Sequence, residues 1–160
     1  MIAFVALGSN LGNRSNNLAM GIRHLAGLGK VTVSPVVMET EDESGTGPAY
    51  LNTVAKLDTA IPDPMALLEE CLRIELECGR DRALPPNAPR PLDLDLITAA
   101  GWGGEWHWEA PADLVCVAPR ITLIMPHPRA KLREFVMVPL AALGADIGQK
   151  PSCAPHAQPQ

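Results

Sequence analysis

Apolar and polar positions alternate along the chain in patterns that predict a succession of strands and helices. A continuous apolar run at 1–7 is typical of a buried strand, whereas Leu18, Ile22 and Leu25 recur at helical spacing. Turn-rich and proline-rich stretches separate such segments. We expect strands at 1–7, 31–38, 50–57, 92–97 and 121–125, and helices at 15–29, 64–79 and 129–138.

Capping residues indicate where the first two helices begin and end. Ser15 is expected to cap the first helix and Gly29 to end it. Asp63 followed by Pro64 is a strong start for the second helix, and Gly79 is its expected end.

The order of these elements predicts the fold class. Strands and helices run β-α-β-β-α-β, with a further α/β excursion toward the C-terminus. This order indicates an α+β protein of the ferredoxin-like plan, in which helices pack on an antiparallel sheet. A chain of 160 residues forms one ordinary domain. We expect this domain to span 1–144 and the Pro-, Ala- and Gln-rich stretch 145–160 to be a flexible tail.

Two aspartates stand in the apolar run that begins at Leu92. In a strand, Asp93 and Asp95 point to one face while the intervening leucines point to the other. Two neighbouring carboxylates need either bulk water or a counter-ion. A divalent cation such as Mg²⁺, held by carboxylates and substrate phosphates, satisfies this need. The alternative is an edge strand with one solvated face.

Three arginines precede these aspartates in a proline-rich segment at 80–91. Arg80, Arg82 and Arg90 could bind phosphate oxygens while a metal bridges others, which indicates a polyphosphate clamp. A flap of this kind suits phosphoryl-type transfer, which depends on positioning and charge neutralisation. The alternative is a solvated loop whose arginines pair with nearby acids.

Aromatic and amide side chains indicate a site for a flat heterocycle. Period-two alternation turns Tyr50 and Asn52 to the same face of their strand, where they could stack on a ring and read its edge. Phe135 would complete a sandwich if its helix opposes the sheet, although core packing of Leu132, Phe135 and Val136 is an equal alternative.

Charge and cysteine content narrow the classes of partner. The net charge of −5 argues against a general nucleic-acid or anionic-membrane surface, and no apolar run reaches the length of a membrane span. Residues 1–7 have no basic flank and are expected to form a strand, not a signal peptide. We expect a cytoplasmic monomer that binds small molecules, with its cysteines reduced: Cys71, Cys78, Cys116 and Cys153.

Several short motifs together resemble 6-hydroxymethyl-7,8-dihydropterin pyrophosphokinase, over roughly 3–143. Each motif alone is modest, but their order and spacing are highly specific. The motifs are Ala6-Leu7-Gly8-Ser9-Asn10-Leu11-Gly12, Tyr50-Leu51-Asn52, Ile74-Glu75-Leu76 with Gly79-Arg80, Pro89-Arg90-Pro91-Leu92-Asp93-Leu94-Asp95, and Pro126-His127-Pro128 through Arg133, Phe135 and Pro139-Leu140.

The resemblance implies a folate-pathway enzyme that moves a pyrophosphoryl group from ATP to the pterin hydroxymethyl group and releases AMP. It implies two Mg²⁺ ions on Asp93 and Asp95. The catalytic residues would be Arg80, Arg90, Asp93 and Asp95. The pterin would be bound by Thr40, Tyr50, Asn52, Phe135 and Asp93, and the nucleotide by Glu75, Arg80, Arg82, Arg90, His127 and Arg133.

The sequence departs from the family pattern in its flaps. Residues 41–43 are three consecutive acids, and Asn87-Ala88 replaces the usual Trp-Gly. A longer stretch at 99–119, read as a hairpin-like excursion that includes the apolar run 114–117, carries three tryptophans. Our hypothesis is that they replace the missing lid aromatic, the alternative being that they cluster with one another: Trp102, Trp106 and Trp108.

Two other classes of function compete with this one. The first is a ferredoxin-like module that senses a nucleotide or pterin without turning it over. Such a module is expected to lack one of the metal-binding aspartates or the arginines of the flap, and this sequence retains all of them. A metal-dependent phosphohydrolase would need a fixed base to activate water, and His127 is the only candidate. The sequence favours transfer over both.

Overall fold

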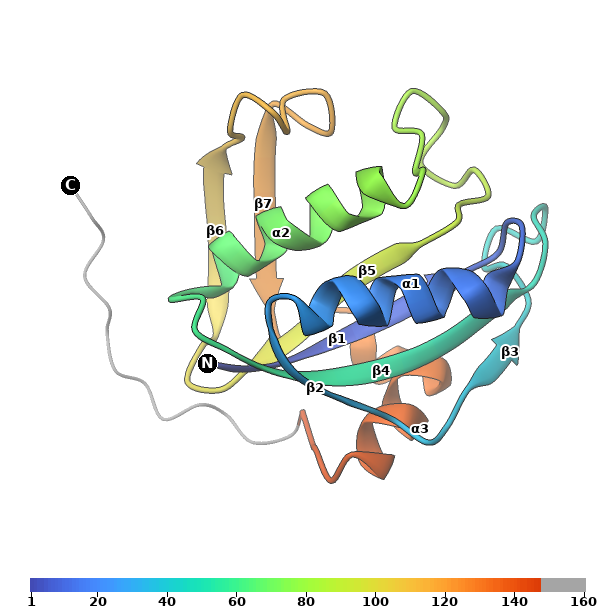
Figure 1. The fold of residues 1–160 in the computed structure, drawn as a ribbon, viewed down its shortest axis with the longest axis horizontal. Helices are drawn as coiled ribbons and strands as arrows, with labels where there is room; N and C mark the ends of the chain where they lie inside the picture. Colours follow the sequence, from blue (N-terminus) through green and yellow to red (C-terminus); the bar gives the residue numbers. More distant parts are fainter. Residues whose placement is uncertain (148–160) are drawn as a thin grey trace.

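A five-stranded antiparallel sheet forms the centre of the structure, a computed structural model that describes residues 1–147 (Figure 1). The sheet has the order β2-β4-β1-β5, and β3 also pairs with β4. β1 is therefore an inner strand with a partner on each side. The strands are β1 (Ile2–Ser9), β2 (Gly29–Val33), β3 (Met38–Thr40), β4 (Tyr50–Thr59) and β5 (Asp93–Ala99).

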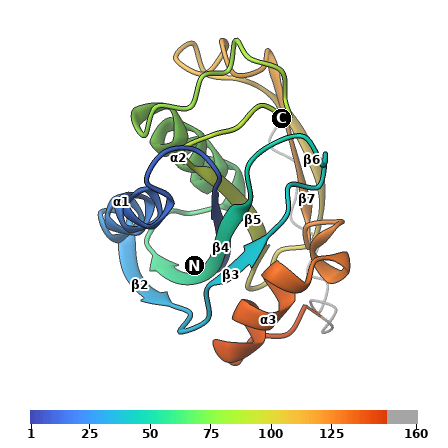
Figure 2. The same cartoon turned by 90° about the vertical axis from the view of Figure 1, so that its right-hand side faces the viewer.

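Helices cover both faces of this sheet. α1 (Arg14–Ala26) and α2 (Pro64–Glu77) lie on one face and α3 (Glu134–Ala142) lies on the other (Figure 2). Because both faces are covered, the side chains of β1 are apolar at nearly every position, which explains the continuous apolar run at the start of the chain.

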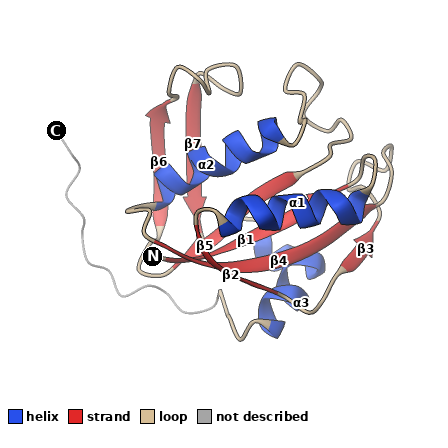
Figure 3. Cartoon of the chain, in the orientation of Figure 1, coloured by secondary structure: helices blue, strands red, loops and turns tan. Residues whose placement is uncertain are grey.

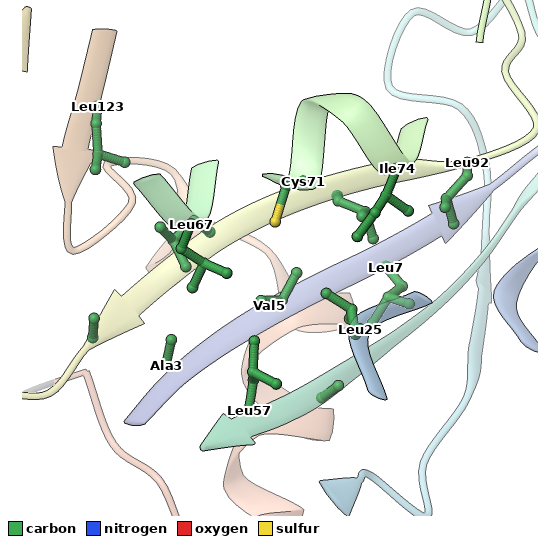
Figure 4. Packing of buried hydrophobic residues seen from close by; sticks show 14 of the residues in the cluster. Ala3, Val5, Leu7, Leu25, Leu57, Leu67, Cys71, Ile74, Leu92 and Leu123 are labelled. Carbon is green, nitrogen blue, oxygen red and sulfur yellow. The ribbon is translucent and has the colours of Figure 1, made fainter. Parts of the chain in front are cut away.

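Leucine side chains dominate the core between the sheet and the α1–α2 layer. Leu7 and Leu57 from the sheet meet Leu25 of α1 and Leu67 of α2 (Figure 4). α1 approaches closely because Gly21 has no side chain: a Cβ atom there would lie 3.0 Å from Leu92 Cδ1. The apolar stripe of each helix thus fixes the helix against the sheet.

A two-stranded hairpin stands apart from the main sheet. β6 (Gly104–Glu109) pairs with β7 (Arg120–Met125), and the hairpin rises beside α2 (Figures 1 and 3). Trp108 packs against the main core, and its Nε1 atom donates to Glu69 Oε1 on α2 at 2.8 Å. The excursion predicted at 99–119 therefore forms a hairpin with the following strand, although 114–117 is a turn and not a strand.

Several predicted boundaries are wrong. Asn13, not Ser15, caps α1, because its side chain accepts from the Asn16 amide at 3.0 Å. Gly29 begins β2 and does not end the helix. The predicted strand at 31–38 is divided at Pro35, whose ring cannot donate to a ladder. Asp63 caps α2 as expected, through the Ala66 amide at 2.9 Å.

The end of the described chain also differs from expectation. Leu132 is 83% exposed, because residues 130–132 form a single 3₁₀ turn and α3 begins only at Glu134. Val136 is buried as expected. Ile147 packs with α3, and most of the predicted tail at 145–160 lies outside the described residues.

Two further predictions concern membrane-spanning helices and the state of the cysteines. No helix within residues 1–147 is long and apolar enough to cross a membrane. Cys71, Cys78 and Cys116 are free thiols, as expected, whereas Cys153 lies outside the described residues.

Candidate active site

A cavity of about 660 Å³ opens where β1, β4 and β5 meet the loops at one end of the sheet. Residues from α2, α3 and the segments 41–49, 80–91 and 127–133 complete its wall. Every site residue predicted from the sequence lines it: Thr40, Tyr50, Asn52, Glu75, Arg80, Arg82, Arg90, Asp93, Asp95, His127, Arg133 and Phe135.

Strand register brings the two halves of the site together at Gly8. Gly8 of β1 lies opposite Asn52 of β4 on one side and Asp93 of β5 on the other. A Cβ atom on Gly8 would lie 3.3 Å from Asn52 Oδ1 and 3.4 Å from Tyr50 Cδ1. Glycine therefore leaves the floor of the cavity open between the aromatic residue and the aspartates.

Asp93 and Asp95 share one face of β5, as their spacing predicts, while Leu94 is buried on the other face. Arg80 and Arg90 both donate to Asp93 Oδ1, the latter at 3.2 Å. Burial raises the pKa of Asp93, but the two arginine charges outweigh burial and hold the pKa below its ordinary value. Burial and the charge of Asp93 raise the pKa of Asp95 to about 6.

The aspartate pair fits a magnesium ion whose other ligands come from elsewhere. No group of three or more His, Cys, Asp or Glu side chains that could hold a metal exists within residues 1–147. Arg133 donates to Asp95 Oδ2 at 3.4 Å, so one oxygen of each aspartate accepts no hydrogen bond from the described residues. Mg²⁺ commonly takes one or two carboxylates and completes its shell with phosphates and water.

Glu75 is a buried carboxylate that organises two of the arginines. It is 1% exposed, and its Oε1 atom accepts from the Leu94 amide at 2.7 Å. Its Oε2 atom accepts from Arg82 and lies 3.0 Å from Arg80 Nη1. Burial, together with the charge of Asp93, raises the pKa of Glu75 to about 7 despite both arginines.

The Arg-rich segment 80–91 contains neither helix nor strand, as its prolines predict. Arg90 donates through its side chain to the Pro86 carbonyl at 2.5 Å and to the Ala88 carbonyl at 3.3 Å, so the guanidinium folds over its own loop. The Nε atom of Arg82 is buried and has no hydrogen-bond partner among the described residues. All three arginines donate to carboxylates of the site, Arg80 and Arg90 to Asp93 and Arg82 to Glu75.

The opposite end of the cavity carries the aromatic and amide groups. Asn52 is 6% exposed, and its Nδ2 atom donates to Thr40 Oγ1 at 2.9 Å and to the Met38 carbonyl at 3.3 Å. Its amide plane is therefore fixed by β3. Phe135 reaches the cavity from α3, and its ring centroid lies 5.5 Å from Arg133 Cζ.

His127 lies between two prolines at the rim of the cavity. Its Nδ1 atom accepts from the Arg129 amide at 3.2 Å, and its own amide donates to the Ile97 carbonyl at 2.8 Å. Burial, with the charges of Arg133 and Arg129, lowers the pKa of His127. A neutral imidazole with a fixed acceptor is therefore expected at neutral pH.

The cavity lining includes residues that were not indicated by the sequence, and three residues that the sequence suggested are absent from the lining. Leu68 and Leu72 line the cavity from α2, one helical turn apart and beside the buried stripe. Their spacing alone could have indicated a second, half-buried apolar stripe beside the core-facing one. None of the three tryptophans lines the cavity, which contradicts the hypothesis that they replace a lid aromatic: Trp102, Trp106 and Trp108 pack against the core.

Comparisons with known proteins show the family of this chain. The family model of 7,8-dihydro-6-hydroxymethylpterin-pyrophosphokinase matches residues 4–145. The 2-amino-4-hydroxy-6-hydroxymethyldihydropteridine pyrophosphokinase of Haemophilus influenzae is 33% identical over 148 residues, covering 91% of this chain and 82% of the relative. Its namesake from Pseudomonas aeruginosa is 35% identical, covering 90% of this chain and 81% of the relative.

Some relatives are much longer than this chain. The match to the folic acid synthesis protein fol1 of Schizosaccharomyces pombe, 31% identical, covers 91% of this chain but only 18% of that protein. A solved structure of Plasmodium falciparum HPPK-DHPS matches with a TM-score of 0.61 at 13% identity, over 89% of this chain and 39% of that one. The structural match supports the fold, and the sequence matches establish that this chain belongs to the 7,8-dihydro-6-hydroxymethylpterin-pyrophosphokinase family.

Proposed function

We propose that the protein transfers the pyrophosphoryl group of ATP to 6-hydroxymethyl-7,8-dihydropterin, with release of AMP, in folate biosynthesis. One observation carries the proposal: a single cavity brings the aromatic and amide residues together with the paired aspartates and the arginines. The relatives are named for pyrophosphate transfer to this pterin. The hydroxymethyl oxygen attacks the β-phosphorus, the bond from that phosphorus to the AMP oxygen breaks, and the hydroxyl proton is released.

The pterin would lie at the end of the cavity that Tyr50 and Phe135 flank. Two rings facing a flat heterocycle provide stacking, and the fixed amide of Asn52, with Thr40 beside it, provides edge recognition. Gly8 leaves room for the hydroxymethyl group to point toward Asp93. The acceptor hydroxyl would thus be held next to the phosphate-binding groups.

The triphosphate would lie along the aspartates and arginines. Two Mg²⁺ ions on Asp93 and Asp95 would neutralise charge on the transferred group and on the leaving oxygen. Arg80 and Arg90 would donate to the phosphates from the 80–91 segment, and Arg82 with Glu75 would support that segment from below. His127 and Arg133 would contact the nucleotide from the other wall.

We propose that the central sheet and its helices follow the ferredoxin-like plan. The order β2-β4-β1-β5, in which α1 joins β1 to β2 and α2 joins β4 to β5, supports the ferredoxin-like plan, to which β3, the β6–β7 hairpin and α3 are additions. We also propose that the protein acts as a cytoplasmic monomer on small molecules alone. Its domain would span 1–144 and also include Ile147, which packs with α3.

Product analysis tests the reaction directly. Purified protein is incubated with ATP, Mg²⁺ and 6-hydroxymethyl-7,8-dihydropterin, and the nucleotide products are separated by chromatography. AMP that forms only with pterin is the expected result. ADP would mean ordinary kinase chemistry, pterin-independent hydrolysis would mean a phosphohydrolase, and binding without turnover would mean a sensor module.

A further inference from the structure

Glu43 links the acidic segment 41–49 to the opposite wall of the cavity. Its Oε2 atom accepts from Arg129 Nη2 at 2.7 Å and from Arg133 Nη2 at 3.1 Å, and its Oε1 atom accepts from Arg133 Nε at 3.2 Å. Both carboxylate oxygens are therefore engaged, with a two-pronged contact to Arg133.

The same contact geometry is the one that arginine offers to a phosphate group. Paired N–H donors bind two oxygens of a planar carboxylate or of a phosphate in parallel. Arg133 is 14% exposed in its side chain, and its remaining Nη1 atom points to Asp95 Oδ2 at 3.4 Å. A phosphate can therefore reach the outer donors of Arg133 only after Glu43 leaves them.

The carboxylates of the 41–49 segment also change the balance of formal charge along the cavity wall. The wall outside the 41–49 segment holds five arginines against three carboxylates: Arg80, Arg82, Arg90, Arg129 and Arg133 against Glu75, Asp93 and Asp95. That wall suits a polyanion. The 41–49 segment adds three more carboxylates to the lining and reverses the excess of positive charge.

Only one of those three acids reaches the arginines. Asp42 is used inside its own segment, where it accepts from the Gly47 amide at 2.9 Å and from the Ser44 amide at 3.3 Å. Glu41 makes no ion pair with the described residues. Burial raises the pKa of Glu43, but hydrogen bonds and charge from Arg133 and Arg129 outweigh burial and lower it overall. Glu43 is thus a charged competitor at neutral pH.

We propose that Glu43 is an internal competitor for the anion-binding arginines Arg129 and Arg133. Binding of the polyphosphate displaces the Glu43 carboxylate and thereby releases the 41–49 segment from the 129–133 wall. Substrate affinity and release of this segment are then linked, since each contact excludes the other. This inference rests on the proposed function in taking a polyphosphate as the ligand of the site.

Calorimetric titration with inorganic tripolyphosphate and Mg²⁺ tests the competition. Glu43→Gln removes the competing charge at a position that is 44% exposed, so folding is retained. We expect this variant to bind tripolyphosphate about three- to tenfold more tightly than the parent protein, as two ion pairs of this exposure imply. The comparison variant Glu41→Gln removes the same charge from the same segment without removing a contact to an arginine, so its gain in affinity should be smaller than that of Glu43→Gln.

A second pair of variants separates competition from general electrostatics. In an Arg129→Ala background, Glu43→Gln should gain less affinity than in the parent background, because one of the contested donors is gone. Three outcomes would each overturn the inference. The first is a gain in affinity of equal size in both backgrounds, and the second is equal affinity of the Gln variants at 41 and 43. The third is that none of the proteins binds tripolyphosphate. Failure of the proposed function has a separate signature, the absence of pterin-dependent AMP.

Discussion

Asn10 and Arg90 exchange two hydrogen bonds although eighty positions separate them in the chain. The Arg90 amide donates to Asn10 Oδ1 at 2.8 Å, and the Asn10 amide donates to the Arg90 carbonyl at 3.2 Å. Asn10 Nδ2 also donates to the Pro48 carbonyl at 3.2 Å, and the residue is 2% exposed. One buried side chain therefore holds the last residues of both segments that border the cavity, 41–49 and 80–91.

We expect Asn10→Ala to lower both stability and turnover. The substitution leaves the Arg90 amide and the Pro48 carbonyl without their partners, which should reduce the free energy of unfolding by about 1–3 kcal/mol. Turnover should fall because Arg90 and the end of the 41–49 segment lose the side chain that holds them beside the cavity. Urea unfolding and the rate of pterin-dependent AMP formation measure the two effects.

Asn17→Ala is the matched control for this prediction. Asn17 donates to Ser9 Oγ at 3.3 Å and to the Leu11 carbonyl at 2.8 Å, but it contacts neither cavity segment. It should therefore lower stability with little effect on kcat. An equal loss of kcat in the two alanine variants would contradict the coupling assigned to Asn10.

Asp95→Asn should nearly abolish turnover while the fold is retained. The asparagine keeps the shape of the side chain, which is 38% exposed, but removes the charge that a magnesium ion needs. We expect kcat to fall by at least about two orders of magnitude, as for the loss of a metal clamp. Initial rates and a Mg²⁺ titration measure the effect, with the exposed substitution Asp58→Asn on β4 as control. Near-normal turnover would refute the metal role of Asp95.

Much of the fold follows from local patterns in the sequence. The apolar run of β1, the alternation in β4 and the Asp63–Pro64 start of α2 each contain their own signal, and all three are confirmed. The start of α3 could not be predicted, because Leu132 resembles a core residue and is exposed only through a 3₁₀ turn. Tertiary context there overrides the periodic pattern.

The parts of the site that are formed by residues close in sequence could be predicted. The parts that depend on contacts between residues far apart in sequence could not. Asp93 and Asp95 share a face by strand geometry alone. The Glu43–Arg133 contact joins residues 90 positions apart, so no spacing rule indicates it. The tryptophan hypothesis failed for a related reason: the missing motif aromatic suggested a replacement lid, whereas β6 and the residues just before it place those rings against the core.

Stability should depend on pH through Glu75. Its pKa rises from 4.5 to about 7 on folding, so the folded protein holds a proton that the unfolded chain has lost between these values. The free energy of unfolding therefore falls as pH rises through this window. The glutamine of Glu75→Gln cannot ionise. The free energy of unfolding of this variant, relative to that of the parent protein, should therefore rise by about 1–3 kcal/mol as the pH is raised from about 5 to about 8. Urea unfolding at the two pH values measures this difference.

The control for Glu75 must remove a carboxylate that is solvated. Glu134→Gln does so at the exposed start of α3 and serves as the matched variant in the same unfolding series. Asp95, whose pKa is raised to about 6, is present in both proteins, so only the part of the pH dependence that Glu75→Gln abolishes is assigned to Glu75. A parallel pH dependence in the parent protein and Glu75→Gln would contradict the raised pKa.

Trp108→Phe should weaken the fold without weakening the nucleotide site. The ring packs on the core beneath the β6–β7 hairpin, and its Nε1 atom donates to Glu69 Oε1 at 2.8 Å. Loss of that hydrogen bond and of part of the ring should lower the free energy of unfolding by about 1–2 kcal/mol. ATP affinity should remain within about twofold, because Trp108 does not line the cavity. Phe135→Ala, which does alter the lining, should instead weaken pterin binding, and a Trp108→Phe variant that lost ATP affinity would restore the tryptophan to a lid role.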